Sequence, residues 1–142
     1  MAYGKNRKKT QDRDGNQFVL IPWIVMDSEK FKELPNTAKV LLLYMARQVG
    51  PNNNGQLLAS TRYMQKHYAW KSSDVLFRAK KRLLNDGFIY ETVKGRRPNR
   101  ASWYGVTWLP LMRHPDFDAG AHEGFVRSAY AKNEAPCPFK RV

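Results

Sequence analysis

The sequence has one cysteine, few acidic residues and no long apolar run. Cys137 is alone among 142 residues, so no internal disulfide can form, which favours a reducing cytoplasm. The longest apolar stretch, residues 18–26, contains Pro22 and is too short to cross a bilayer. Twelve acidic residues face 25 lysines and arginines, which leaves a net charge of +13. We therefore expect a cytoplasmic domain that lacks disulfides and membrane spans.

The excess of positive charge points to a polyanionic partner, most simply nucleic acid. Residues 60–100 hold eleven lysines or arginines and three acids, a net charge of +8, whereas residues 111–142 have a net charge of +1. A membrane surface is the other candidate, but no basic amphipathic helix with a wide apolar face stands out. The uneven distribution favours a binding unit within residues 60–100.

No residue pattern typical of catalysis is found. His67, His114 and His122 are far apart, and there is no glycine-rich phosphate loop. The stretch HPDFDAGAHE (residues 114–123) holds conceivable metal ligands without the spacing of a metal motif. We expect no enzyme, no cofactor and no metal site, and we interpret Cys137 as an inert thiol in the tail.

The N-terminal third predicts a tail, a strand and a short helix. Residues 1–17 contain the cluster KNRKK and no aliphatic stripe, which predicts a disordered basic arm, either solvated or in contact with nucleic acid. Residues 18–26 predict an extended, β-rich segment with Pro22 at an edge or bend. Asp27 and Ser28 offer an N-cap for a short helix that ends near Leu34.

Three longer helices are expected next. Asn36 or Thr37 can cap a helix to about Val49 that is apolar nearly all round, as in a central core helix. After a turn at residues 51–55 and a short strand at 56–58, Ser60 can cap a helix over 61–68. Ser72 to Asp74 can cap a further helix that ends at Gly87, with a core stripe of Leu76, Ala79 and Leu83.

The period of the apolar residues changes from 3.6 to 2 after Gly87. Residues 88–93 and 103–108 predict a half-buried antiparallel hairpin joined by a cationic loop. From Leu111 onward only one weak helix, at 123–132, is expected. Trp23, Tyr44, Trp70, Tyr104 and Trp108 fit the apolar periodicity and are expected in the core, so only Trp103 and Tyr90 could stack on single-stranded bases.

The stretch LLASTRYMQKHYAWKSSDVLFRAKKRLLNDGFI resembles the helix-turn-helix of winged-helix DNA-binding proteins, and RLLNDGFI matches their usual ending. With NNNGQL before it and WYGVTWL after it, residues 18–109 are similar to small helix-turn-helix proteins of prophages, plasmids and integrative elements, and to winged-helix domains of phage and plasmid replication proteins. The resemblance implies an α+β winged helix-turn-helix at 18–110, followed by an extension, 111–142, that could serve interaction or dimerisation. Lys80 departs from the family, where leucine often follows the mid-helix alanine, so either Leu84 replaces that packing or the helix is rotated.

In such a fold the second helix enters the major groove of DNA and the hairpin forms a wing. Arg78 suits a bidentate contact to guanine, and Phe77 could pack on a thymine methyl group. Asp74 either accepts from a cytosine amino group or stabilises the N-terminus of the helix. The residues expected to contact bases at this helix are Lys71, Ser72, Ser73, Asp74, Phe77, Arg78 and Lys81. Those expected to contact phosphates or the minor groove are Lys94, Arg96, Arg97 and Arg100 in the wing, with Arg62 and Lys66 in support.

The leading hypothesis is a transcriptional regulator of a mobile element that binds double-stranded DNA sequence-specifically. We expect it to bind as a homodimer, with residues 18–26 or those after Leu111 available for the contact. A replication-initiation or partition factor that binds origin repeats is the first alternative. A protein-interaction winged helix that does not bind DNA is the second, and a non-specific or single-strand binder is the third. The net charge of +8 in residues 60–100 argues against the interaction module.

Overall fold

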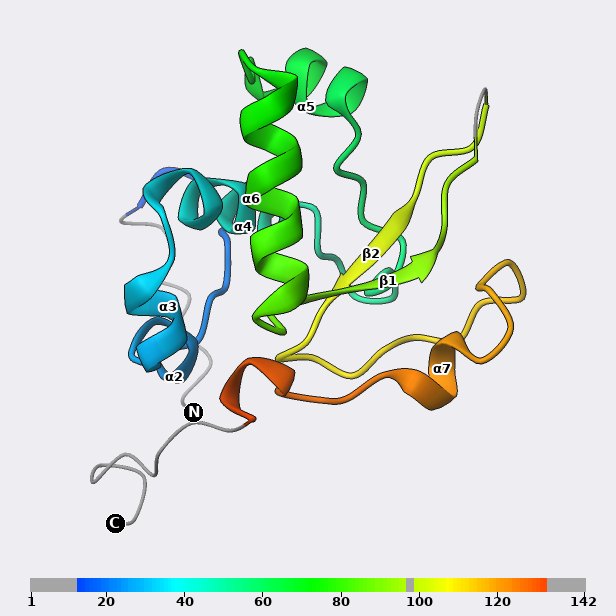
Figure 1. Ribbon diagram of the computed structural model, residues 1–142. Helices are drawn as coiled ribbons and strands as arrows, with labels where there is room; N and C mark the ends of the chain where they lie inside the picture. The colour runs from blue at the N-terminus through cyan, green and yellow to red at the C-terminus, as the bar shows by residue number, and fades with distance from the viewer. Residues whose placement is uncertain (1–12, 97–98, 133–142) are drawn as a thin grey trace, which may run out of the picture.

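The computed structural model describes residues 13–96 and 99–132. In this part of the chain, six α-helices, a 3-10 turn and a two-stranded antiparallel sheet form a mixed α+β structure (Figure 1). No described helix combines the length and apolar character needed to cross a membrane. In chain order the elements are α2 (Trp23–Met26), α3 (Glu29–Glu33), α4 (Asn36–Arg47), α5 (Thr61–Tyr68), α6 (Ser73–Asn85), β1 (Ile89–Val93), β2 (Trp103–Val106), α7 (Ala121–Gly124) and η1 (Ala129–Ala131).

Some of the expectations concern residues outside the described ranges, namely 1–12 of the basic arm, Arg97 of the cationic loop, and Cys137. The remaining residues of the arm, 13–17, are exposed and form neither helix nor strand.

Three helices begin at the serines that the sequence indicated. The side-chain oxygens of Ser28, Ser60 and Ser72 each accept a hydrogen bond from the backbone N–H three residues later. Such caps satisfy donors that the first helical turn leaves without a partner. The prediction of a side-chain cap on α4 is wrong, because this helix begins at Asn36 after Pro35, and no side-chain cap bond is formed there.

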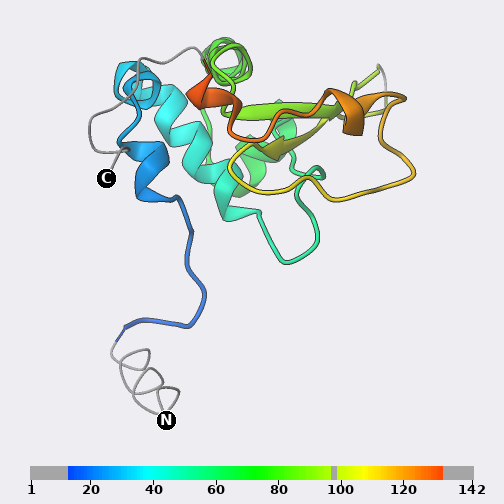
Figure 2. The ribbon, with the colours of Figure 1, turned by 90° about the horizontal axis from the view of Figure 1, so that it is seen from below.

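The core lies between α4, α6 and the sheet. Leu41, Leu42 and Met45 of α4 are buried, as is the predicted stripe of α6, Leu76, Ala79 and Leu83. Figure 2 shows α4 crossing beside α6, and the two helices pack on each other. The expectation that α4 is buried nearly all round is wrong on one face, because Val40 and Leu43 are exposed.

A left-handed residue makes the turn from α5 to α6. Ala69 has φ 55°, and its N–H donates to the carbonyl of Gln65 while the Trp70 N–H donates to that of Met64. This is the pattern that closes many helices. The Trp70 indole N–H donates to the Ser72 carbonyl at 2.9 Å, which ties the end of α5 to the start of α6.

Strands β1 and β2 pair in the register Ile89 with Val106 and Glu91 with Tyr104, with an irregularity between Glu91 and Val93. The strand expected at 56–58 is reduced to one bridge, in which Leu57 and Tyr104 exchange both backbone hydrogen bonds. The expected half-buried strand is also wrong in part, because β2 ends at Val106 and is buried on both faces from Tyr104 onward.

Residues 111–132 cover the second face of the hairpin. The Asp118 N–H donates to the Thr92 carbonyl at 2.9 Å, and the Ser128 N–H to the Thr107 carbonyl at 2.7 Å. The helix expected at 123–132 is therefore wrong. The chain forms only α7 and η1 in this region, and between them the Ser128 N–H donates to Thr107, just after β2, instead of to a helical carbonyl.

The N-terminal expectation also needs correction. Residues 18–22 form no strand and pair with none, and residues 23–26, expected to be extended, form α2. The Pro22 carbonyl, just before this helix, accepts from the Val25 N–H at 3.0 Å. Trp23, expected in the core, is 85% exposed, because α2 directs only Val25 inward.

Candidate nucleic-acid interface

One face of α6 presents the predicted side chains to solvent. Ser73, Asp74, Phe77, Arg78 and Lys81 are all exposed, on the side of the helix away from its buried stripe. Phe77 is 63% exposed although it is a large apolar residue. Lys71 is exposed as well, whereas Ser72 is half-buried because it caps the helix. These side chains are thus open to solvent, and their contact with DNA stays a prediction.

The hairpin tip holds three of the four predicted cations in the described residues. Lys94, Arg96 and Arg100 are exposed. Arg96 and Arg100 exchange two backbone hydrogen bonds of 2.8 and 2.9 Å, which makes a narrow turn. Gly95 is needed here, since a Cβ at this position would lie 2.6 Å from the Arg100 carbonyl oxygen. The tip is anchored by the Asp118 carboxylate, which accepts the Lys94 N–H at 2.8 Å.

A groove of about 720 Å³ separates the hairpin tip from the start of α5. Four cations line it: Arg62 from α5, Lys80 from α6, and Arg96 and Arg100 from the tip. Polar or small groups make up the remaining lining, which is Ser60, Thr61, Gly95, Asn99, Ala101, Ser102 and Tyr104. The groove therefore brings together Arg62 of α5 and the arginines of the hairpin tip, which the sequence predicted separately. Lys66 is exposed on α5 but does not line it.

Lys80 is the groove residue that sequence reasoning did not assign to binding. Its Nζ donates to the Ala59 carbonyl at 3.1 Å and lies 5.8 Å from the centre of the Tyr104 ring. Burial lowers the pKa of Lys80, and the Glu91 carboxylate opposes that effect. The sequence signal that could have assigned Lys80 to the groove was the lysine itself, at a position where the resemblance favours leucine. Leu84 packs against the core, which agrees with the alternative in which Leu84 replaces the packing of that leucine.

Tyr104 is the buried aromatic residue of the groove lining, and Lys80 lies over its ring. Burial raises the pKa of Tyr104 to about 12, with a smaller opposing hydrogen bond from Ser102 and a smaller supporting effect of Glu91. The phenol is therefore neutral at ordinary pH and can donate a hydrogen bond. Within the described residues, ion pairs join Lys32 to Glu29 and Arg82 to Asp86, and none involves a cation of the groove.

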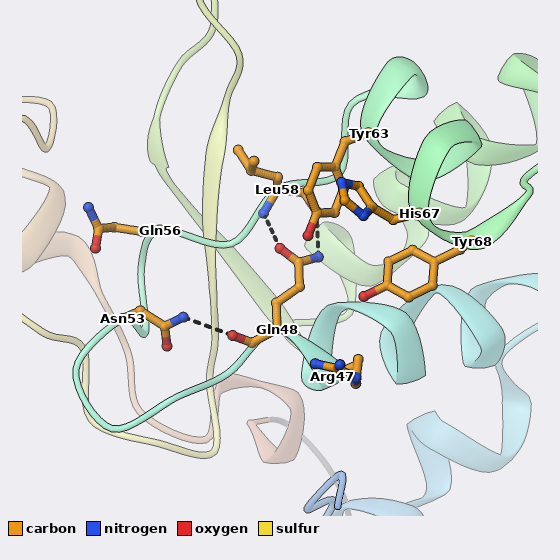
Figure 3. A pocket seen from close by; sticks show the side chains of 8 residues that line it. All are labelled: Arg47, Gln48, Asn53, Gln56, Leu58, Tyr63, His67 and Tyr68. Carbon is orange, nitrogen blue, oxygen red and sulfur yellow. Dashed lines mark hydrogen bonds between the residues drawn. The ribbon is translucent and has the colours of Figure 1, made fainter. Parts of the chain in front are cut away.

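A second concavity, about 460 Å³, lies between the end of α4 and α5 (Figure 3). Its polar groups hold the backbone together: the Gln48 amide donates to the Leu58 carbonyl and accepts the Leu58 N–H, both at 2.8 Å. The Asn53 amide likewise donates to the Gln48 carbonyl and accepts the Gly50 N–H. We interpret these hydrogen bonds as structural, because they fix the backbone that leads into α5.

The two aromatic residues considered for base stacking are engaged elsewhere. The ring of Trp103 lies 5.2 Å from that of His114, and the Tyr90 hydroxyl donates to the Ala121 carbonyl at 2.6 Å. Of the expected core aromatics, Tyr104 and Trp108 are buried, while Tyr44 and Trp70 are half-buried against the core. Across residues 13–96 and 99–132, no three histidine, cysteine or acidic side chains come close enough to hold a metal ion.

Searches of protein-family models, of curated proteins and of solved structures found no match to this chain.

Proposed function

We propose that residues 18–110 form a winged helix-turn-helix that binds double-stranded DNA in a sequence-specific way, and that the protein regulates transcription. In this proposal α5 and α6 are the helix-turn-helix and the β1–β2 hairpin is the wing. The observation that supports it best is the cation-lined groove, since Arg62, Lys80, Arg96 and Arg100 converge there from three elements.

The arrangement suits a duplex. The N-terminus of α6 and the hairpin tip lie on the same side of the molecule, the upper side in Figure 1. A helix fits the major groove, which is about 12 Å wide, while the adjacent phosphates would reach the cations of the groove and tip. Arg78 and Phe77, both exposed near the start of α6, are the side chains best placed to contact base edges.

Selection from a pool of random duplexes tests the proposal. The enriched sequence and a scrambled version are titrated with the protein at one salt concentration, and we expect at least about a thousand-fold preference for the enriched one. The variant Arg78→Ala should bind the enriched site about 1–3 kcal/mol more weakly and relax the preference at one base pair. The control Arg127→Ala removes the same charge from an exposed position elsewhere and should leave both affinities unchanged.

Two results would contradict the proposal: no enriched sequence, or equal losses for Arg78→Ala on the enriched and scrambled duplexes. A genomic map of bound sites then separates the regulator from the replication factor, because promoters favour the first and clustered origin repeats the second.

A further inference from the structure

Residues 18–26 present an unusual amount of apolar surface. The exposed fractions are 59% for Phe18, 70% for Leu20, 85% for Trp23, 51% for Ile24 and 46% for Met26. Single exposed apolar residues are common, but five within nine consecutive residues are not. With roughly 150–200 Å² per side chain, these fractions leave on the order of 500 Å² uncovered. The largest apolar patch on a typical monomer is about this size, and such a patch is often functional.

The segment is held in place, so the patch is a defined surface. Val19 and Ile21 pack against the core, and Val25 is fully buried. The Ser28 hydroxyl donates to the Val25 carbonyl at 2.7 Å, and the Asp27 N–H donates to the Trp23 carbonyl at 2.8 Å. The outward side chains are therefore presented in one arrangement, which lowers the entropy lost on binding.

The charges around the patch favour a second copy of this chain as its occupant. Two copies that each have a net charge of +13 repel, most strongly where residues 60–100 face each other. Residues 18–26 hold no charged side chain, and residues 13–34 as a whole have a net charge of −1 with both signs present. A surface of mixed sign can face its own copy across a two-fold axis with opposite charges paired.

Size and position agree with this occupant. A stable interface covers about 800 Å² per partner, with an apolar centre and a polar rim. The patch supplies such a centre, and the charged side chains of α3 beside it, Glu29, Lys32 and Glu33, supply a rim. Figures 1 and 2 both place α2 at the far end of the molecule from the hairpin tip, so the contact leaves the groove open. Residues 111–132, the other segment considered for dimerisation, already pack on the sheet.

We propose that Phe18, Leu20, Trp23, Ile24 and Met26 form the centre of a two-fold homodimer contact. The contact needs no DNA, so it can be tested independently of the proposed function. Trp23 is its anchor, since a large aromatic residue at the centre of an interface typically dominates the binding energy.

Analytical ultracentrifugation of the full chain, without DNA and from about 1 to 100 μM, tests the proposal. We expect a concentration-dependent shift from the 16.5 kDa monomer to twice that mass. Trp23→Glu should weaken the dimer by at least about 30-fold, as expected for an anchor residue. The control Val126→Glu changes an exposed apolar residue, 45% exposed, outside the patch and should not alter the dimer.

Circular dichroism checks that Trp23→Glu is folded; if it is not, Leu20→Glu replaces it, because Leu20 is exposed and lies outside any helix. A wild-type monomer up to 100 μM would overturn the proposal, as would a dimer that Trp23→Glu and Leu20→Glu leave intact. Iodide quenching of tryptophan fluorescence, compared between wild type and Trp23→Phe, measures how accessible Trp23 is in the monomer. A shielded Trp23 would also overturn the proposal, because another part of the same chain would then cover the patch.

Discussion

The two ends of this molecule expose opposite kinds of surface. Residues 60–100 place cations around a groove between α5, α6 and the hairpin, whereas residues 18–26 expose apolar side chains and no charge. Both surfaces are fixed by the same core, through Val25 on one side and Leu76, Ala79 and Leu83 on the other.

The comparison shows that exposure has a different meaning for each kind of residue. An exposed lysine or arginine is the ordinary state of a charged side chain and needs no partner to explain it. The basic surface is informative because its cations converge from distant parts of the chain and line one groove. An exposed tryptophan is informative by itself, because water contact with so large an apolar surface is unfavourable, by about 25 cal/mol per Å².

The largest expected effect breaks both surfaces together. Leu83 is fully buried in the core that they share, so Leu83→Ala should lower the free energy of unfolding by about 2–5 kcal/mol. Leu84→Ala, at a half-buried position of the same helix, should cost less. Urea unfolding measures the loss, and near the unfolding midpoint DNA binding and self-association should fail in parallel. Failure of one without the other would mean that the two surfaces belong to independently folding units.

Residues 18–26 contain no ionisable side chain, so among these two surfaces only the groove responds directly to high pH, through Tyr104. Its pKa is about 12 in the folded protein against the ordinary 10.0, so the folded state favours the protonated phenol. The resulting stabilisation is present in full below pH 10 and is lost as pH rises through 12, in total roughly 2–3 kcal/mol. Urea unfolding of wild type and Tyr104→Phe from pH 9 to 12 measures it, and an equal decline in both proteins would exclude this role of Tyr104.

Salt dependence should distinguish the surfaces next. The double variant Arg96→Ala, Arg100→Ala removes two exposed cations of the groove. The slope of log affinity for DNA against log salt should become shallower by about 1.8, at about 0.9 per phosphate contact, with the ranking of sequences unchanged. Self-association should not change. The double variant Arg113→Ala, Arg127→Ala, at exposed positions outside the groove, is the matched control. An equal change of the slope in the two double variants would mean that only the net charge of the protein matters.

Local signals explain why α5 and α6 could be predicted from the sequence. Ser60 and Ser72 cap the helices with their own side chains, and Gly87, with φ 82°, follows the end of α6. Each of these signals acts within one turn of chain, and the buried stripe of α6 follows from helical period alone. The predicted DNA-contacting face of α6 rests on the same information.

The groove and the apolar patch depended on contacts that periodicity does not contain. The groove exists because Leu57 pairs with Tyr104, which brings the start of α5 beside the hairpin. Residues 18–26 were expected to be extended because β-branched and aromatic residues are frequent there, but they pair with no strand and a helix begins after Pro22 instead. Whether an apolar residue is buried depends on the surface opposite it, so Trp23 could not be placed from its neighbours in the sequence.

The smallest expected effect concerns Lys80, the half-buried cation of the groove. Lys80 lines the groove, its Nζ lies 5.8 Å from the centre of the Tyr104 ring, and burial lowers its pKa. Lys80→Leu removes one cation and the bond to the Ala59 carbonyl but adds apolar contact with Tyr104, so stability should change by less than about 1 kcal/mol. The salt slope for DNA should become shallower by about 0.9 if Lys80 contacts a phosphate. Lys39→Leu, at a half-buried lysine of α4 outside the groove, should leave the slope unchanged. An unchanged slope for Lys80→Leu with intact stability would make Lys80 a packing residue, and the phosphate contacts would then belong to the exposed arginines alone.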